Sequence, residues 1–155
     1  TVQMPPMEQL EAQAIFAFLQ KQKGSFENFT IQAPLNNKGV SYSETDILVN
    51  AVHAAGVSAI AMDGFSQTTN ALRAGDIIKF ANHSKVYMVQ SDVTASGGGA
   101  TVNISPNLVT ALADNEAVTV NKPLFTVYLA NDEIMYSTDA SGLYTISFDV
   151  REVIT

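Results

Sequence analysis

Tyr144-Thr145-Ile146-Ser147-Phe148-Asp149-Val150-Arg151 is the stretch, close to the end of the chain, that decides the fold. Apolar and polar side chains alternate along it, and residues two apart on a strand point to the same face of a sheet. The pattern predicts one strand, running on to Val153, with an apolar face on a core and a polar face on water or on a partner. The apolar face comprises Tyr144, Ile146, Phe148 and Val150, and the polar face comprises Thr145, Ser147, Asp149 and Arg151.

Short apolar runs bounded by turn residues fill the chain before this strand. The runs are Val49–Ala54, Val57–Met62, Ile77–Phe80, Val86–Val89, Thr101–Ile104, Val118–Val120 and Leu124–Leu129. Asp63-Gly64 and Asn82–Lys85 are expected turns, Ser96–Gly99 an open flexible loop, and residues 107–113 a turn or short helix opened by Pro106. About nine short strands at this spacing favour a small barrel or sandwich, so the fold class is mainly β.

The start of the chain is the exception, because its apolar residues follow a helical spacing. A helix is predicted from Pro6 to about Gln22, with Gly24 as its C-terminal cap. We expect its core-facing stripe to be Leu10, Ala14, Ala17 and Phe18, widened by Ile15 and Leu19. A strand over Phe26–Ile31 and a turn over Asn36–Gly39 are expected to follow.

Composition excludes several classes of protein. The 155 residues carry a net charge of −7, and the eight Lys and Arg are scattered, which argues against a nucleic-acid surface. The absence of Cys excludes disulfides, zinc–thiolate sites and thiol nucleophiles. No apolar run approaches the roughly 20 residues of a membrane helix. Because the sequence starts at Thr1 instead of Met, we expect a fragment or a processed product.

No arrangement of residues in the sequence matches known catalytic machinery. His53 lies in an apolar run and is expected to be a satisfied core or edge residue, whereas His83 lies in a hairpin turn and is expected to be exposed. Five aspartates fall at turns, where such side chains bond the local backbone: Asp63, Asp76, Asp92, Asp114 and Asp132. We therefore predict a protein that is not an enzyme and holds no metal or cofactor.

Three stretches together resemble the distal tail proteins, or closely related minor tail proteins, of siphophages. The first is Met7–Phe26, a helix that runs into Gly24-Ser25-Phe26; the second is Leu72–Leu108, with Leu72-Arg73-Ala74-Gly75-Asp76 and Asp92-Val93-Thr94; the third is Tyr144–Val153. These motifs are structural and carry no chemistry. Family members usually have further strands ahead of the helix, which are absent here.

The resemblance implies a β-sandwich or split-barrel ring domain with an inserted small β-barrel. The ring (belt-like) domain would comprise residues 1–48 and 121–155, incomplete at its N-terminus, and the barrel residues 49–120. The protein would be made in the host cytoplasm and form a hexameric ring in the virion. This ring would join the major tail tube protein to the hub of the baseplate, with no nucleic-acid sequence recognition and no membrane.

A ring subunit needs two different contact faces, because closed rings larger than dimers are built from heterologous contacts. The candidate faces are the polar side of the last strand (Thr145, Ser147, Asp149, Arg151) and the polar side of the helix (Glu8, Glu11, Gln13, Gln20). Arg151 has the alternative role of a solvated residue at a strand end. The alternative for the whole chain is a monomeric β module that binds a carbohydrate or receptor, although there is no Trp on which a sugar could stack.

Overall fold

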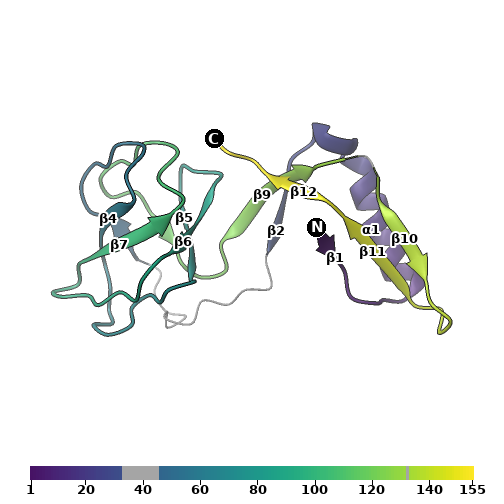
Figure 1. Cartoon of the computed structure of the whole chain (residues 1–155), viewed down its shortest axis with the longest axis horizontal. Coiled ribbons are helices and arrows are strands. Elements are labelled where there is room, and N and C mark those ends of the chain that lie inside the picture. The colour runs from purple at the N-terminus through teal and green to yellow at the C-terminus, as the bar shows by residue number, and fades with distance from the viewer. Residues whose placement is uncertain (33–45, 132) are drawn as a thin grey trace. The chain divides into compact units, whose positions relative to one another are not determined.

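The computed structural model describes residues 1–32, 46–131 and 133–155. As predicted, the chain is mainly β, with twelve strands and one α-helix among the described residues (Figure 1). Contacts divide it into two compact units: residues 1–30 with 126–153, and residues 31–125 with 154–155. None of the helices in the described ranges is long and apolar enough to cross a membrane.

The larger unit contains a six-stranded antiparallel sheet in the order β3-β4-β7-β6-β5-β8. Its strands are β3 (Leu48–Val49), β4 (Ala59–Asp63), β5 (Ile77–Phe80), β6 (Val86–Val89), β7 (Ala100–Ser105) and β8 (Val118–Thr119). The two outer strands meet, since the Val49 N–H donates to the Glu116 carbonyl at 2.9 Å and the Val118 N–H to the Ile47 carbonyl at 3.0 Å. The sheet is therefore a nearly closed barrel.

Every second side chain of the barrel strands points into the barrel interior and fills it. Val102 and Ile104 of β7 are buried, while Thr101 and Asn103 between them are exposed. Phe80 lies at the centre of the core, with its ring centroid 5.4 Å from that of the fully buried Tyr87. Burial of such aromatic side chains is the main stabilising contribution in a small β domain.

Two of the connections differ from the sequence-based expectation. Ser96–Gly99 is a tight turn and not an open loop: Ser96 and Gly99 exchange main-chain hydrogen bonds of 2.9 and 3.1 Å. Gly97 and Gly98 both have positive φ, at 59° and 80°, as a two-residue hairpin turn requires. Residues 107–113 form no helix; this segment instead buries Leu108 and Leu112 in the barrel core.

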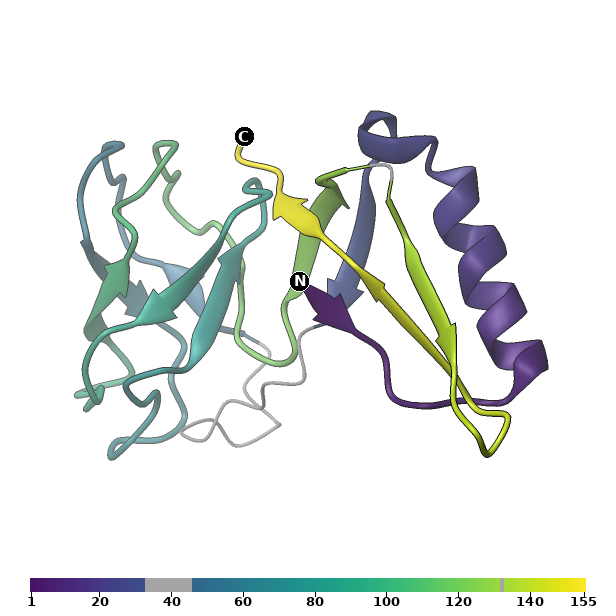
Figure 2. The same ribbon diagram turned by 45° about the vertical axis from the view of Figure 1, so that its right-hand side comes forward.

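The smaller unit contains a three-stranded antiparallel sheet in the order β1-β11-β10, made of β1 (Val2–Gln3), β10 (Met135–Thr138) and β11 (Tyr144–Phe148). The helix α1 (Gln9–Lys21) lies along one face of this sheet (Figure 2). Its Phe16 ring is 5.7 Å from that of Tyr136, which is in turn 5.2 Å from that of Tyr144. Ile146 of β11 is fully buried on the same face, opposite Tyr136.

In the predicted closing strand the side chains alternate as expected, but the segment forms two strands and not one. Ile146 and Phe148 are both buried, as expected. At Asp149, however, the chain leaves the β1-β11-β10 sheet and enters a second one in the order β12-β9-β2. That sheet comprises β12 (Val150–Glu152), β9 (Leu124–Leu129) and β2 (Phe29–Gln32).

The predicted N-terminal helix is confirmed, but α1 begins three residues later than expected. Of the residues predicted to face the core, Leu19 is buried, whereas Leu10 and Phe18 are exposed; Ala12, which was not predicted, is buried. The predicted strand over residues 26–31 begins only at Phe29, because residues 24–26 form a short 3-10 turn. The turn predicted over residues 36–39 lies outside the described residues.

Candidate assembly interface

Two residues of the predicted polar face, Thr145 and Ser147, lie on the sheet face opposite α1. Neighbouring residues of a strand point to opposite faces, and Ile146 between them points towards the helix. Thr145 and Ser147 are both partly exposed. Their partners across β10 are Ser137 and Met135, and the Met135 side chain is 62% exposed. The structure therefore brings together an open, largely polar surface with one apolar side chain.

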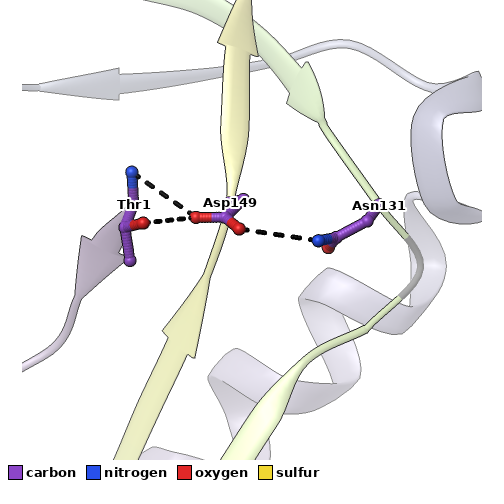
Figure 3. A network of polar contacts seen from close by, with 3 residues as sticks. All are labelled: Thr1, Asn131 and Asp149. Atoms are coloured by element: carbon purple, nitrogen blue, oxygen red, sulfur yellow. Dashed lines mark hydrogen bonds and ion pairs between the residues drawn. The ribbon is translucent and has the colours of Figure 1, made fainter.

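Asp149 lies at the corner between the two sheets, and its carboxylate is bonded within the chain (Figure 3). It accepts a short hydrogen bond from the Thr1 hydroxyl, lies 3.5 Å from the Thr1 ammonium and accepts a bond of 3.5 Å from the Asn131 amide. The Thr1 hydroxyl is the main cause that lowers the pKa of Asp149, against a smaller opposing effect of desolvation. The carboxylate thus ties the start of β1 to the end of β9.

Arg151 does not share a surface strand with Thr145 and Ser147. It belongs to β12, where it is exposed and pairs with Tyr128 of β9. The four residues predicted to form one polar face are therefore divided between two sheets and the corner that joins them. Whether any of them contacts another subunit stays a prediction.

The predicted polar side of the helix is exposed, but it is not one continuous surface. Glu8, Glu11, Gln13 and Gln20 are all exposed. At about 100° per residue, Gln13 and Gln20 lie on one flank of α1 and Glu11 on the other. Glu8 precedes the helix as its N-cap residue.

An apolar surface that the sequence reasoning placed in the core separates these flanks. Leu10 is 81% exposed and Phe18 47% exposed, and the Ala14 and Ala17 side chains between them are exposed as well. A neighbouring pocket of about 450 Å³ lies between α1 and β10 and is lined by Gln13, Phe16, Ala17, Ile134 and Tyr136. The sequence held a signal for this surface, because α1 carries apolar residues on two sides.

The open edges of the β1-β11-β10 sheet also escaped prediction, because the sequence does not reveal the order in which strands pair. In the part of the chain that the structure describes, β1 and β10 each pair with a strand on one side only. All four residues of β10 are exposed. Unpaired strand edges present main-chain donors and acceptors that can pair with another chain.

The barrel's turn carboxylates accept main-chain N–H groups, but only Asp76 bonds the local backbone as predicted, because Asp92 and Asp114 bond residues distant in the sequence. Asp76, Asp92 and Asp114 accept the N–H groups of Arg73, Ala74 and Ala51 at 2.9, 3.0 and 2.7 Å. Asp63 lies at the end of β4, and Asp132 lies outside the described residues. The buried Glu116, which the sequence did not single out, accepts the N–H groups of Asn82 and Ala113 through its two oxygens.

The two histidines differ in how well they were predicted. His53 is a satisfied edge residue, as expected, because its Nε2 accepts the Ala61 N–H at 3.2 Å. His83 was predicted to be exposed, but it is buried, with its Nδ1 2.9 Å from the Tyr87 hydroxyl. That hydroxyl also accepts the Val109 N–H at 3.2 Å. Nε2 is buried without a partner among the described residues.

The barrel is also the part of the chain that comparison with known proteins identifies. A search of curated proteins finds no match. The family described as distal tail protein pb9, B domain, matches residues 43–126, a range that contains every strand of the barrel. Since this match covers more than half of the sequence, the chain belongs to this family of bacteriophage distal tail proteins, and its role is that of a structural protein of the phage tail.

Proposed function

We propose that the chain forms a hexameric ring in the virion that joins the tail tube to the baseplate. Residues 1–48 and 121–155 would form the ring domain and residues 49–120 the inserted barrel. The partners would be further copies of this chain, the major tail tube protein on one side of the ring and the baseplate hub on the other. The protein would be made in the host cytoplasm and act without enzymatic activity.

The observation that carries this proposal is the pair of unlike edges on the β1-β11-β10 sheet. Both edge strands are antiparallel to β11, so they run parallel to each other. The β10 edge of one copy can therefore continue the sheet beyond the β1 edge of the next. A contact between unlike surfaces repeats from copy to copy and closes into a ring when the rotation allows it.

The direction of the main-chain groups on β10 makes this contact testable. Tyr144 exchanges main-chain hydrogen bonds of 2.9 and 3.0 Å with Met7, on the β1 side of β11. In an antiparallel ladder the next residue, Thr145, bonds to the other side, where Ser137 is its partner. The N–H of Thr138 therefore points outward to the open edge, and that of Ser137 points inward.

Sedimentation velocity on the full chain is the experiment. We expect a species about six times the 16.6 kDa monomer mass. Thr138→Pro removes an outward donor and should abolish that species while the far-UV circular dichroism stays that of the wild type. Ser137→Pro is the matched control, since it removes an inward donor and should unfold the small unit. A wild-type chain that stays monomeric at high concentration would support a monomeric binding module instead.

A further inference from the structure

The β1 edge of the β1-β11-β10 sheet exposes the main-chain groups of one residue. Met4, directly after β1, donates its N–H to the Ile146 carbonyl at 2.9 Å, so Met4 is bonded towards β11. Successive residues of a strand direct their main-chain groups to opposite sides. Of the two residues of β1, Gln3 is therefore the one that points its N–H and its C=O outward, and Val2 points them inward.

The β10 edge exposes the main-chain groups of two residues. Ser137 is paired inward with Thr145, so its neighbours Tyr136 and Thr138 direct their main-chain groups away from β11. The edge therefore offers a carbonyl at Tyr136 and an N–H at Thr138, two positions further along. A single residue of a parallel neighbour needs this spacing, because it donates to one residue and accepts from the residue two positions later.

We infer that Gln3 of one copy pairs with β10 of the next in one register, directly opposite Ser137. The inference rests on the proposed ring and names the residues that make its contact. The Gln3 N–H donates to the Tyr136 carbonyl, and the Gln3 carbonyl accepts the Thr138 N–H. A register shifted by two residues towards the start of β10 would need an outward carbonyl at Ile134, which lies outside the strand.

This register determines which side chains meet on the face of the sheet that α1 covers. Val2 lies on that face, where it pairs with the buried Phe148 of its own copy. In the inferred register Val2 lies opposite Tyr136 of the next copy. Tyr136 is 44% exposed and lines the pocket of about 450 Å³ between α1 and β10. Val2 is itself partly exposed, so it is the side chain of β1 that can contact this pocket.

The charges of the two edges are compatible with contact between copies of one chain. Two copies that each carry a net charge of −7 repel one another unless the surfaces that meet are free of like charges. Neither β1 nor β10 contains a charged side chain. On the open face of the sheet the contact brings together Gln3 and Ser137, both exposed, and the amide can bond the hydroxyl.

Double-cysteine cross-linking tests the register, because the sequence has no cysteine of its own. Neighbouring strands lie about 4.8 Å apart, so facing Cα atoms are inside the range for a disulfide. Gln3→Cys with Ser137→Cys in the full chain should therefore give a ladder of covalent oligomers under mild oxidation, since each copy carries one cysteine for each neighbour. Within one copy β11 separates the two positions by about 10 Å, too far for an internal bridge.

Gln3→Cys with Met135→Cys is the matched control. Met135 lies on the same face as Ser137 and is 62% exposed, but it is two residues away along β10. This offset puts its Cα about 8 Å from that of Gln3 in the neighbour, so the control should not cross-link. Cross-linking of the control to the same or a greater extent would overturn the register. So would dimers from Ser137→Cys alone, which require β10 to pair with β10.

Sedimentation velocity tests the side chain that meets the pocket. Val2→Ala should raise the dissociation constant of the subunit contact about three- to tenfold, because it removes two methyl groups from a partly buried position. Val52→Ala, at a barrel residue that is 73% exposed, should leave the constant unchanged. Far-UV circular dichroism should be that of the wild type for both variants. An unchanged constant for Val2→Ala would remove Val2 from the contact and overturn the register.

The cross-linked pair also separates this inference from the proposal of the ring. Ring-sized species in the wild type, without cross-linking of Gln3→Cys with Ser137→Cys, would leave the ring in place and overturn the register. A cross-linked ladder from a chain whose wild type forms no closed species would support the register and overturn the ring. Absence of both the ladder and the ring would overturn both.

Discussion

Replacing Gly64 with alanine is expected to destabilise the barrel much more than the same replacement at Gly56. Both glycines have positive φ, at 82° and 88°, so an alanine pays the same backbone penalty at either position. They differ in what the new methyl group would meet. A Cβ at Gly64 would lie 2.1 Å from the carbonyl oxygen of Asp46, whereas no atom of the described residues lies within 4 Å of one at Gly56.

The magnitude follows from these two contributions. A left-handed conformation costs a non-glycine residue about 1–2 kcal/mol, which is the whole expected effect of Gly56→Ala. At Gly64 the backbone before β3 must also move away, and forced shifts of this kind cost about 1–3 kcal/mol more. The expected total for Gly64→Ala is therefore about 2–5 kcal/mol. For a domain of this size the difference between the variants corresponds to roughly 4 to 24 °C in Tm.

Urea and thermal unfolding, followed by far-UV circular dichroism, measure this difference. The two variants share the change in the unfolded chain, since each replaces one glycine by alanine. Their comparison therefore isolates the close approach of Gly64 to Asp46. Equal losses of stability at the two positions, within about 0.5 kcal/mol, would refute the argument that this approach is what requires a glycine.

Four further predictions concern the smaller unit and the barrel core. Phe148→Ala should cost about 3–5 kcal/mol, while Ser147→Ala on the open face should cost little; equal losses in urea unfolding would show that the register is wrong. The lowered pKa of Asp149 stabilises the fold above the ordinary carboxyl value of 3.8, and this contribution is lost as the pH falls below it. The stability difference between wild type and Asp149→Asn should therefore shrink below about pH 4, and a constant difference would exclude this linkage. Tyr87→Phe should cost about 1–3 kcal/mol in thermal unfolding, because it leaves the buried His83 ring and the part-buried Val109 N–H without their partner, and a neutral effect would contradict that bond network. Finally, if β12 lies at a subunit contact, Arg151→Glu should reduce ring formation and leave the circular dichroism spectrum unchanged. Normal ring formation by this variant would show that Arg151 is a solvated residue outside the contact.

The strands of the barrel were predictable because local signals fix them. Ile77–Phe80 and Val86–Val89 are apolar runs around a turn, and both appear in the structure as β5 and β6. Such features depend on neighbours in sequence, so the chain itself contains the information. The turn predicted at Asp63-Gly64 is wrong, because Asp63 is the last residue of β4 and Gly64 follows it in an irregular segment.

Features that depend on distant neighbours were predicted less well. The inner and outer faces of α1 both have apolar residues at helical spacing, and only the sheet that packs against the helix selects Ala12 and Leu19. Residues in turns are usually exposed, so the sequence predicted an exposed His83. Its ring instead lies 5.5 Å from that of Phe80, and no pattern in the sequence indicates this contact. Alternation through Asp149 fixed which side chains point inward, but it carried no information about which strand pairs with which.

The candidate interface shows the same limit. Glu8, Glu11, Gln13 and Gln20 were correctly placed on the surface, because charged and amide side chains on a helix are solvated by default. The open edge of β10 depends on pairing order, and the pocket beside it depends on how α1 lies on the sheet. Neither property can be obtained from periodicity alone.

The first and last segments of the barrel lie side by side. The residues just before β3 and the start of β8 are joined by the hydrogen bond from Val118 to Ile47, although some seventy positions separate them. When the two ends of an inserted module lie close together, the flanking segments need not move apart to accommodate it, whatever the length of the module. A different module with the same separation between its ends could be grafted there, or a short turn could replace the barrel altogether. Exchange of such modules would let a phage change this part of the protein while the smaller unit keeps its sequence.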